Sequence, residues 1–105
     1  MKRLNIDKIF IPYLKEIKRI ANHPYIAKGY IYNFIFLNGF TVNVNNLMQH
    51  YNRYRNLWDL TIYKDNKLYF YKLNKKGGVF YNLTEAEVNK ILLKVKKGEI
   101  NEPYN

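Results

Sequence analysis

Alternating apolar and polar residues, followed by an apolar stripe of helical period, make residues 57–95 the most regular part of the chain. A tight turn at Asp65-Asn66 would place Ile62 opposite Tyr69, with apolar side chains on one face of the resulting hairpin. The same register gives three further pairs: Leu60 with Tyr71, Trp58 with Leu73 and, as opposite charges on the outer face, Asp59 with Lys72. Because apolar and charged pairs agree in one register, this pattern predicts a β-hairpin.

A third strand and a helix are predicted after this hairpin. The strand follows a loop at residues 74–78, and its inner-facing residues are Val79, Tyr81 and Leu83. Thr84 and Glu87 have the spacing of a capping box, in which each side chain bonds the backbone N–H of the other residue. Gly98 is the expected end of the helix. The apolar stripe of the helix consists of Val88, Ile91, Leu92 and Val95.

An earlier hairpin is predicted around Asn38-Gly39, because a two-residue turn needs two positions that tolerate positive φ. That turn places Leu37 opposite Phe40 and thereby sets the face of every other residue. The core face would consist of Ile31, Ile35, Leu37, Phe40, Val42 and Val44. The other face would carry the aromatic row Tyr30, Tyr32, Phe34 and Phe36, opposite Thr41 and Asn43.

Apolar residues at near-helical spacing predict an N-terminal helix between Asp7 and Ala21. Either Asp7 caps a helix that Pro12 kinks, or the helix starts at Pro12, whose missing N–H costs nothing at the first helical position. We favour the start at Pro12, with the end at residues 22–24, because the residue before a proline avoids the helical region. For residues 45–56 we predict a short helix or an ordered loop.

Together these elements predict an α+β fold: an antiparallel sheet of about five strands in two hairpin units, with an N-terminal and a C-terminal helix packed on it. The length suits a single domain over residues 1–105, with about residues 1–5 and 99–105 as loose termini. No window approaches the roughly 20 apolar residues that cross a bilayer. Without cysteine, the chain needs no oxidising compartment. We therefore expect a cytoplasmic protein that does not enter a membrane.

The formal net charge of +10 raises affinity for polyanions through release of their counterions. It argues against an acidic protein that mimics DNA. An AT-rich genome would also enrich Lys, Asn, Ile and Tyr, so the composition by itself does not establish nucleic-acid binding.

Two groups of residues are candidates for contact with a partner. Tyr30 and Tyr32, at the start of the aromatic row, would stack on unpaired bases if their sheet face were open. If a helix covers that face, the row is core, and we favour this interpretation. The second group surrounds the connector and the second hairpin: His50, Arg53, Tyr54, Arg55, Lys64, Lys67, Lys72, Lys75 and Lys76. These residues would bind protein or nucleic acid, or would form a solvated edge that discourages strand addition.

Catalysis would require titratable groups gathered at one place. His23 precedes a proline and is interpreted as a helix boundary. His50 lies beside Arg53 and Arg55, which suits a phosphate contact or proton transfer in RNA cleavage. No second histidine or acid is near it in sequence. We expect no enzymatic activity, no cofactor and no metal.

Residues 38–40, 56–60 and 83–88 together resemble a group of small uncharacterised phage and prophage proteins. That group shares an Asn-Gly-aromatic turn, a Leu-Trp-Glu-Leu strand and a Leu-Thr-Glu-Glu-Glu-Val helix start. The resemblance covers residues 36–97, with Asp59 and Ala86 where the group has Glu, and Asn56 where it has Gly.

The resemblance implies an accessory protein of a mobile element, of the anti-CRISPR type, that binds a host defence nucleoprotein. The alternatives are direct binding to single-stranded or duplex nucleic acid, and a structural or assembly role in the virion. An exposed strand edge in so small a domain also suggests a homodimer.

Overall fold

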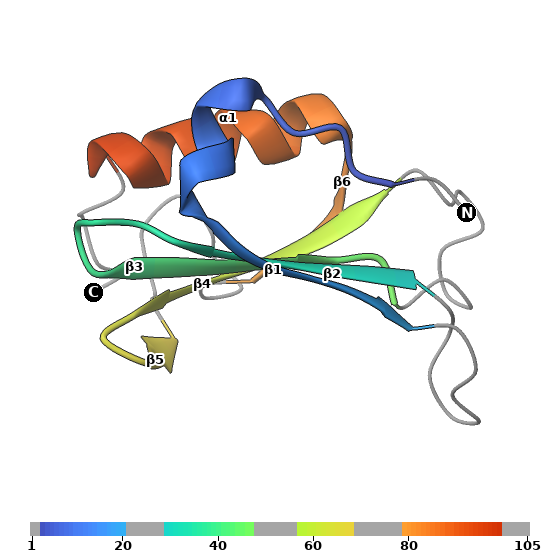
Figure 1. Cartoon of the computed structure of the whole chain (residues 1–105), viewed down its shortest axis with the longest axis horizontal. Coiled ribbons are helices and arrows are strands. Elements are labelled where there is room, and N and C mark those ends of the chain that lie inside the picture. Colours follow the sequence, from blue (N-terminus) through green and yellow to red (C-terminus); the bar gives the residue numbers. More distant parts are fainter. Residues whose placement is uncertain (1–2, 21–28, 48–56, 69–78, 100–105) are drawn as a thin grey trace.

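The computed structural model describes residues 3–20, 29–47, 57–68 and 79–99, which form a sheet with helices on one side (Figure 1). In chain order the elements are the 3-10 helix η1 (Lys8–Tyr13), β1 (Leu14–Ile20), β2 (Gly29–Ile35), β3 (Phe40–Asn45), β4 (Trp58–Lys64), β5 (Lys67–Leu68), β6 (Val79–Leu83) and α1 (Glu85–Lys97). The six-stranded sheet has the order β1-β2-β3-β4-β5, and β6 also pairs with β4. Every pairing is antiparallel, so the predicted α+β class is confirmed.

The predicted N-terminal helix is wrong in its extent. Asp7 caps the short η1, accepting a hydrogen bond from the Ile9 N–H, and Pro12 lies inside this 3-10 helix. The residues that follow form edge strand β1, in which no residue is fully buried. An amphipathic helix is stabilised by burying its apolar stripe, whereas β1 gains backbone hydrogen bonds to β2 while Ile17 stays 42% exposed.

Within the predicted loose N-terminus, Leu4 and Asn5 contact the rest of the structure. Leu4 is 6% exposed, and its N–H donates to the Tyr32 hydroxyl over 3.1 Å. The Asn5 N–H donates to the carboxylate of Glu85, and Asn89 accepts from the Asp7 N–H at 2.8 Å. These bonds attach the segment to β2 and α1.

The first hairpin forms where predicted, but its register differs by one residue. Ile35 pairs with Thr41, not Val42, because the loop contains three residues, with Gly39 at φ 87°. A shift of one residue exchanges the two faces of a strand. The core residues are therefore Tyr32, Phe34, Phe36, Phe40, Val42 and Val44, whereas Ile35 is 47% and Leu37 94% exposed.

Asn38 explains the longer loop. A positive φ was predicted at this turn position, but the Asn38 side chain stabilises the loop instead. Its Oδ1 accepts from the Phe40 N–H at 3.2 Å, and its Nδ2 donates to the Val95 carbonyl at 2.8 Å. Val95 lies in the last turn of α1, which ends at Gly98 in the left-handed conformation. The turn is thus attached to the end of the helix.

The second hairpin agrees with its prediction as far as the described residues extend. Asp65 and Asn66 have φ values of 51° and 66°, and Lys64 pairs with Lys67. The inward residues Trp58, Leu60 and Ile62 are each at most 1% exposed. The predicted partners Tyr69, Tyr71, Lys72 and Leu73 lie outside the described residues.

Strand β6 confirms the prediction for Leu83 but not for Val79 and Tyr81. Val79 pairs with Thr61 and therefore lies on the opposite face from the core. Leu83 is 7% exposed, whereas Tyr81 is 54% exposed. The pairing with β4 shifts between Trp58 and Leu60, and Asn82 takes a positive φ of 57°. This irregularity turns the strand between Tyr81 and Leu83, so the two side chains do not share a face.

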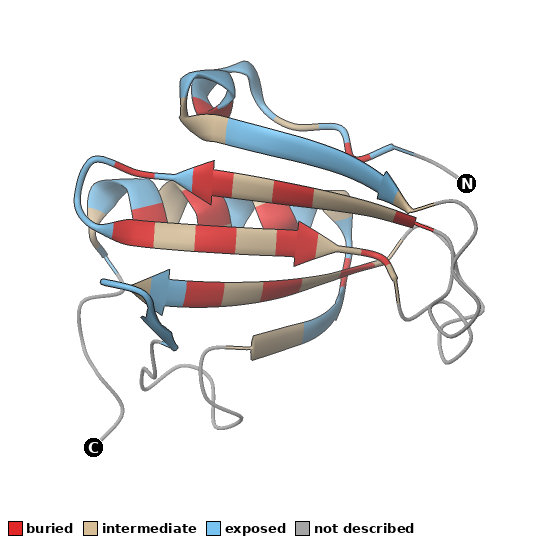
Figure 2. Ribbon diagram, turned by 60° about the horizontal axis from the view of Figure 1, so that its bottom comes forward, coloured by how far each residue is buried: buried red, intermediate tan, exposed pale blue. Residues whose placement is uncertain are grey.

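Helix α1 confirms the predicted capping box and stripe. The Thr84 hydroxyl accepts from the Glu87 N–H, and the Glu87 carboxylate accepts from the Thr84 N–H. These bonds from Thr84 lower the pKa of Glu87. The buried stripe of Val88, Leu92 and Val95 lies over the buried side chains that alternate with half-buried ones along β2, β3 and β4 (Figure 2).

The contact between Asn38 and α1 can be tested by the Asn38→Asp substitution. This change keeps an acceptor for the Phe40 N–H but replaces the amide donor with a negative charge beside the carbonyls at the helix end. We expect the free energy of unfolding, measured by urea denaturation, to fall by about 1–3 kcal/mol. The control Leu37→Ala, at an exposed position, should change it by less than about 0.5 kcal/mol. Equal effects of the two substitutions would contradict this role for Asn38.

Candidate binding surface on the uncovered sheet face

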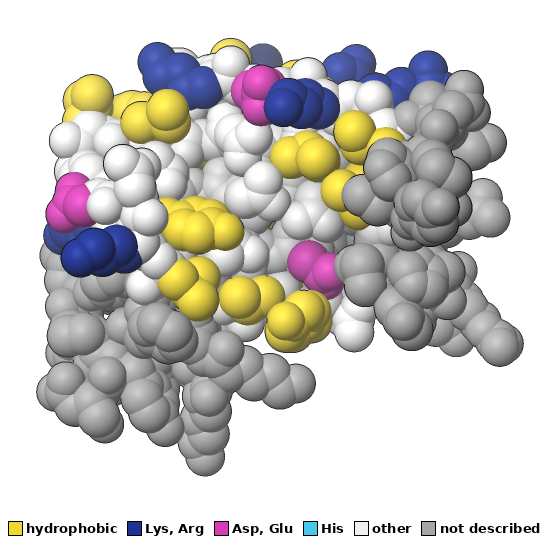
Figure 3. Space-filling view, turned by 90° about the horizontal axis from the view of Figure 1, so that it is seen from below, with side chains coloured by type: hydrophobic (Ala, Val, Ile, Leu, Met, Phe, Trp, Pro, Cys, Tyr) yellow, Lys and Arg dark blue, Asp and Glu magenta, His cyan; other side chains and the backbone are white. Residues whose placement is uncertain are grey.

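Helices η1 and α1 both lie on the same side of the sheet, so the described part of the chain leaves the opposite face uncovered (Figure 1). We call this opposite face the outer face. Seen directly, it has polar side chains in the middle, hydrophobic side chains around them, and Lys and Arg at its margins (Figure 3). An uncovered sheet face with this composition is a candidate contact surface.

The strand pairings arrange the outer face in rows, because directly opposed residues of antiparallel strands point to the same side. The middle row takes one residue from each of five strands: Glu16, Asn33, Asn43, Thr61 and Val79. The row on one side contains Ile35, Thr41, Tyr63 and Leu68. The row on the other side contains Lys18, Ile31, Asn45 and Asp59.

A chain of side-chain hydrogen bonds runs through the asparagines of these rows. Asn45 Nδ2 donates to Asn43 Oδ1 at 3.0 Å, and Asn43 Nδ2 donates to Asn33 Oδ1 at 2.8 Å. Asn33 Nδ2 then donates to Glu16 Oε1 at 2.9 Å, while the Leu47 N–H donates to Asn45 Oδ1 at 3.3 Å. All four bonds run in the same direction.

The two ends of this amide chain set its direction. The Glu16 carboxylate can only accept hydrogen bonds, and a backbone N–H such as that of Leu47 can only donate. Reversing any one amide would therefore place two donors or two acceptors against each other. Each amide nitrogen has two hydrogens, so Asn33 and Asn43 each keep a second N–H beyond the bonds of the chain. The outer face thus presents amide groups whose orientation is already set.

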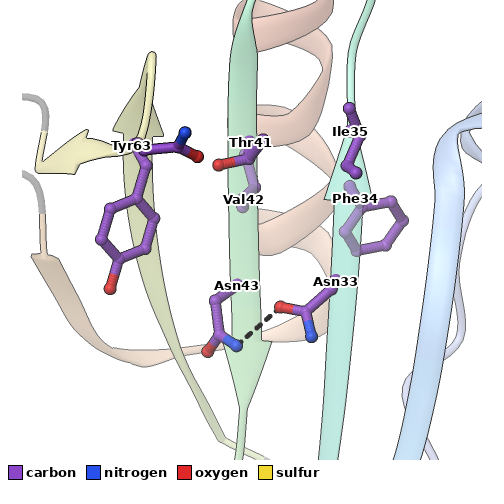
Figure 4. A pocket seen from close by; sticks show the side chains of 8 residues that line it. Asn33, Phe34, Ile35, Thr41, Val42, Asn43 and Tyr63 are labelled. Atoms are coloured by element: carbon purple, nitrogen blue, oxygen red, sulfur yellow. Dashed lines mark hydrogen bonds between the residues drawn. The ribbon is translucent and has the colours of Figure 1, made fainter.

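A depression of about 400 Å³ lies beside the amide chain. Tyr63 and Ile35 stand on its two sides, with the shorter Thr41 between them and the bonded pair Asn33 and Asn43 next to it (Figure 4). Asn66 also lines the depression, and none of its lining residues is charged. It is therefore suited to an uncharged group that can accept or donate hydrogen bonds.

Asp59 is the acidic residue at the other end of the outer face. It is half-buried and accepts a hydrogen bond from the Asn82 N–H at 3.1 Å. Burial raises the pKa of Asp59, and the bond from Asn82 opposes part of that rise. The carboxylate thus ionises less readily than an exposed aspartate.

The structure excludes Tyr32 as a contact residue, confirms for it the favoured interpretation as core, and places three other predicted contact residues. Tyr32 is 2% exposed and packs edge-on against Trp58 with ring centroids 5.7 Å apart, so it belongs to the core and cannot stack on a base. Tyr30 is half-buried, and the Lys64 ammonium lies 4.6 Å from the centroid of the Phe40 ring. Lys67 is exposed.

The remaining predicted contact residues lie outside the described residues: His50, Arg53, Tyr54, Arg55, Lys72, Lys75 and Lys76. Sequence reasoning did not select Asn33, Asn43 or Tyr63 as contact residues. The available signal was the alternation of Thr41, Asn43 and Asn45 along one strand, which needed the correct register of the first hairpin to be interpreted.

Within residues 3–20, 29–47, 57–68 and 79–99, no cluster of three or more His, Cys, Asp or Glu has the arrangement of a metal site. None of the helices in these same ranges combines the length and apolar character needed to span a membrane. Comparisons with models of protein families, with curated proteins and with solved structures found no match.

The raised pKa of Asp59 predicts how stability depends on pH. The folded state binds the Asp59 proton more tightly than the unfolded state, so the stabilisation is full below the unfolded pKa and is lost as pH rises through the folded pKa. The Asp59→Asn substitution keeps an oxygen for the Asn82 N–H and removes the cost of the buried charge. We expect its melting temperature to exceed that of the parent near neutral pH, and the difference to shrink as the pH falls.

The control for this experiment is Asp65→Asn, which removes the same charge from an exposed turn position that also suits asparagine. Thermal unfolding of the parent and both variants would be followed between about pH 3 and pH 7. If the two variants followed the same pH dependence, burial of Asp59 would not be its cause.

Proposed function

We propose that this chain is a small non-enzymatic protein of a phage or related mobile element that binds and inhibits a nucleoprotein complex of host defence, as anti-CRISPR proteins do. The observation that carries the proposal is the outer face of the sheet, which the described residues leave uncovered. The resemblance of residues 36–97 to small phage and prophage proteins and the net charge of +10 support it. The absence of cysteine is consistent with action in the host cytoplasm.

The composition of the outer face supports binding. Tyr63 and Leu68 are 36% and 38% exposed, and Ile35 is 47% exposed. Aromatic and aliphatic side chains around a polar centre are typical of protein contact surfaces, where aromatic residues are enriched. A rigid sheet also presents these groups at little cost in conformational entropy.

The distribution of charge supports a partner that contains nucleic acid. Several described cations lie at the edges of the sheet: Lys15, Lys18 and Arg19 on edge strand β1, and Lys64 and Lys67 on the second hairpin. The lysines of α1 lie on the opposite side of the sheet (Figure 1). The middle row has one charged residue, Glu16. Such an arrangement attracts an anionic partner over long range while the contact itself is made by uncharged groups.

Direct binding to nucleic acid is the second candidate, and the net charge of +10 favours it. It predicts affinity for random oligonucleotides that falls steeply with salt. A protein-directed inhibitor would bind the nucleoprotein complex much more tightly than the free oligonucleotides.

The proposal is tested with purified CRISPR effector complexes, measuring both binding and inhibition of target cleavage. We expect the parent protein to bind and inhibit at least one of them. The Thr61→Arg substitution, in the middle row, should weaken both at least about tenfold by blocking the contact. Leu37→Arg adds the same charge in the exposed loop of the first hairpin and should leave both unchanged.

Thermal unfolding would establish that both variants are folded. If the parent at large molar excess neither bound nor inhibited any candidate complex, the proposed function would be wrong. If it bound free oligonucleotides as tightly as any complex, the second candidate would replace it.

A further inference from the structure

We infer that the depression between Tyr63 and Ile35 is a subsite for one unpaired nucleobase of a single-stranded nucleic acid. The inference rests on the proposed function, because it specifies which part of a nucleoprotein the outer face contacts. It concerns residues that belong neither to the core nor to a cap. Its support comes from the shape, the hydrogen-bonding groups and the charge of this region.

The shape suits one flat ring. Ile35, Thr41 and Tyr63 are directly paired across β2, β3 and β4, so Ile35 and Tyr63 are separated by two strand spacings. Two spacings are roughly 10 Å, which accommodates one ring in van der Waals contact at about 3.5–4 Å with a side chain on each side. Thr41 is shorter than either neighbour and forms the floor. Tyr63 supplies an aromatic face on which a base can stack.

The hydrogen-bonding groups suit the edge of a base. The side chains of Asn33, Asn43 and Asn66 and the Thr41 hydroxyl all border the depression. The amide chain directs Asn43 Nδ2 to Asn33 and Asn33 Nδ2 to Glu16, so neither amide has to reorganise when a ligand enters. Base edges carry closely spaced donors and acceptors, which asparagine amides match with an N–H and an oxygen.

The charge distinguishes a base from a phosphate. The depression is lined by uncharged residues, and Glu16 and Asp59 on the same outer face would repel a phosphate placed over it. Lys64 pairs with Phe40 and lies over its ring, on the core side of the sheet. The exposed Lys67 lies in the same hairpin, at the edge of the sheet, where the nucleic-acid backbone can pass. The neutral base therefore occupies the face and the phosphates stay at its edge.

Charge also favours a nucleic acid over a second copy of the chain as the occupant. Two copies would each bring a net charge of +10 to the same contact, which opposes their association. A single-stranded nucleic acid brings the opposite charge and unpaired bases. Both of its chemical components thus have complementary groups on this side of the molecule.

The experiment measures fluorescence anisotropy of labelled single-stranded DNA homopolymers with the parent and variant proteins at several salt concentrations. Tyr63→Leu removes the ring but keeps apolar bulk, and it should weaken binding roughly 5- to 150-fold, the range that corresponds to one stacked base. The dependence of affinity on salt should stay unchanged, because the lost contact is uncharged. Lys67→Met should instead reduce the slope of log affinity against log salt by about 0.7.

Two further variants provide a second way to block the depression and a control. Thr41→Met fills the floor of the depression from a different strand and should weaken binding to a similar degree, so a folding defect of one variant would not decide the outcome. Tyr81→Leu removes another exposed tyrosine, which does not line the depression, and should leave affinity nearly unchanged. Melting temperatures of all variants would be compared with that of the parent.

The outcomes separate this inference from the proposed function. If Tyr63→Leu and Tyr81→Leu had equal effects, or if the parent bound an effector complex but no homopolymer, the subsite would be refuted while the proposed function stood. If homopolymers bound through Tyr63 but no effector complex bound, the subsite would stand and the proposed function would fail. Concentration-dependent dimerisation abolished by Tyr63→Leu, without homopolymer binding, would assign the face to a second copy.

Discussion

The backbone hydrogen bonds between β2 and β3 form in one register, and the rest of the structure depends on that register. It places Phe34 opposite Val42 and Tyr32 opposite Val44, so the aromatic side of β2 joins the aliphatic side of β3. The bonds of Asn38 to Phe40 and to the end of α1 match this register, since the loop they stabilise is three residues long. Each of these bonds contributes about 1 kcal/mol. Together they favour one of two registers, and the two registers differ in whether the aromatic rings of β2 are buried.

Once the aromatic face is set, the positions of both helices follow. Tyr32, Phe34 and Phe36 share one hydrophobic core with Val88, Leu92 and Val95 of α1 and with Phe10 of η1. In this core η1 lies against β2, and α1 lies against β3, β4 and β6. The N-terminal segment is attached to α1 through Asn89 and Glu85, and to β2 through the hydroxyl of Tyr32. Because all of this apolar surface is on one side, the helices gather there and the outer face stays uncovered by the described residues (Figure 1).

The outer face combines two properties that a contact surface needs. Its amide chain is oriented by Glu16 at one end and the Leu47 N–H at the other, so its polar groups are arranged before a partner arrives. Its apolar residues stand beside these amides on a sheet that does not have to fold on binding. Cations of β1 and of the second hairpin lie at the edges of the sheet, where they attract an anionic partner without having to lose their water. The proposed inhibitor function and the proposed base subsite use the same three features.

The local sequence determined three features, because each depends on neighbours in the chain or on alternation within one strand. They are the capping box of Thr84 and Glu87, the turn at Asp65 and Asn66, and the inward residues Trp58, Leu60 and Ile62. Only tertiary structure decided that residues 14–20 form an edge strand, that Tyr32 is core and that Asn33, Asn43 and Tyr63 share one surface. Asn38 shows the reason: the partner that its amide binds is a carbonyl 57 residues away. The register, and with it the candidate site, was therefore set by a contact that no local pattern contains.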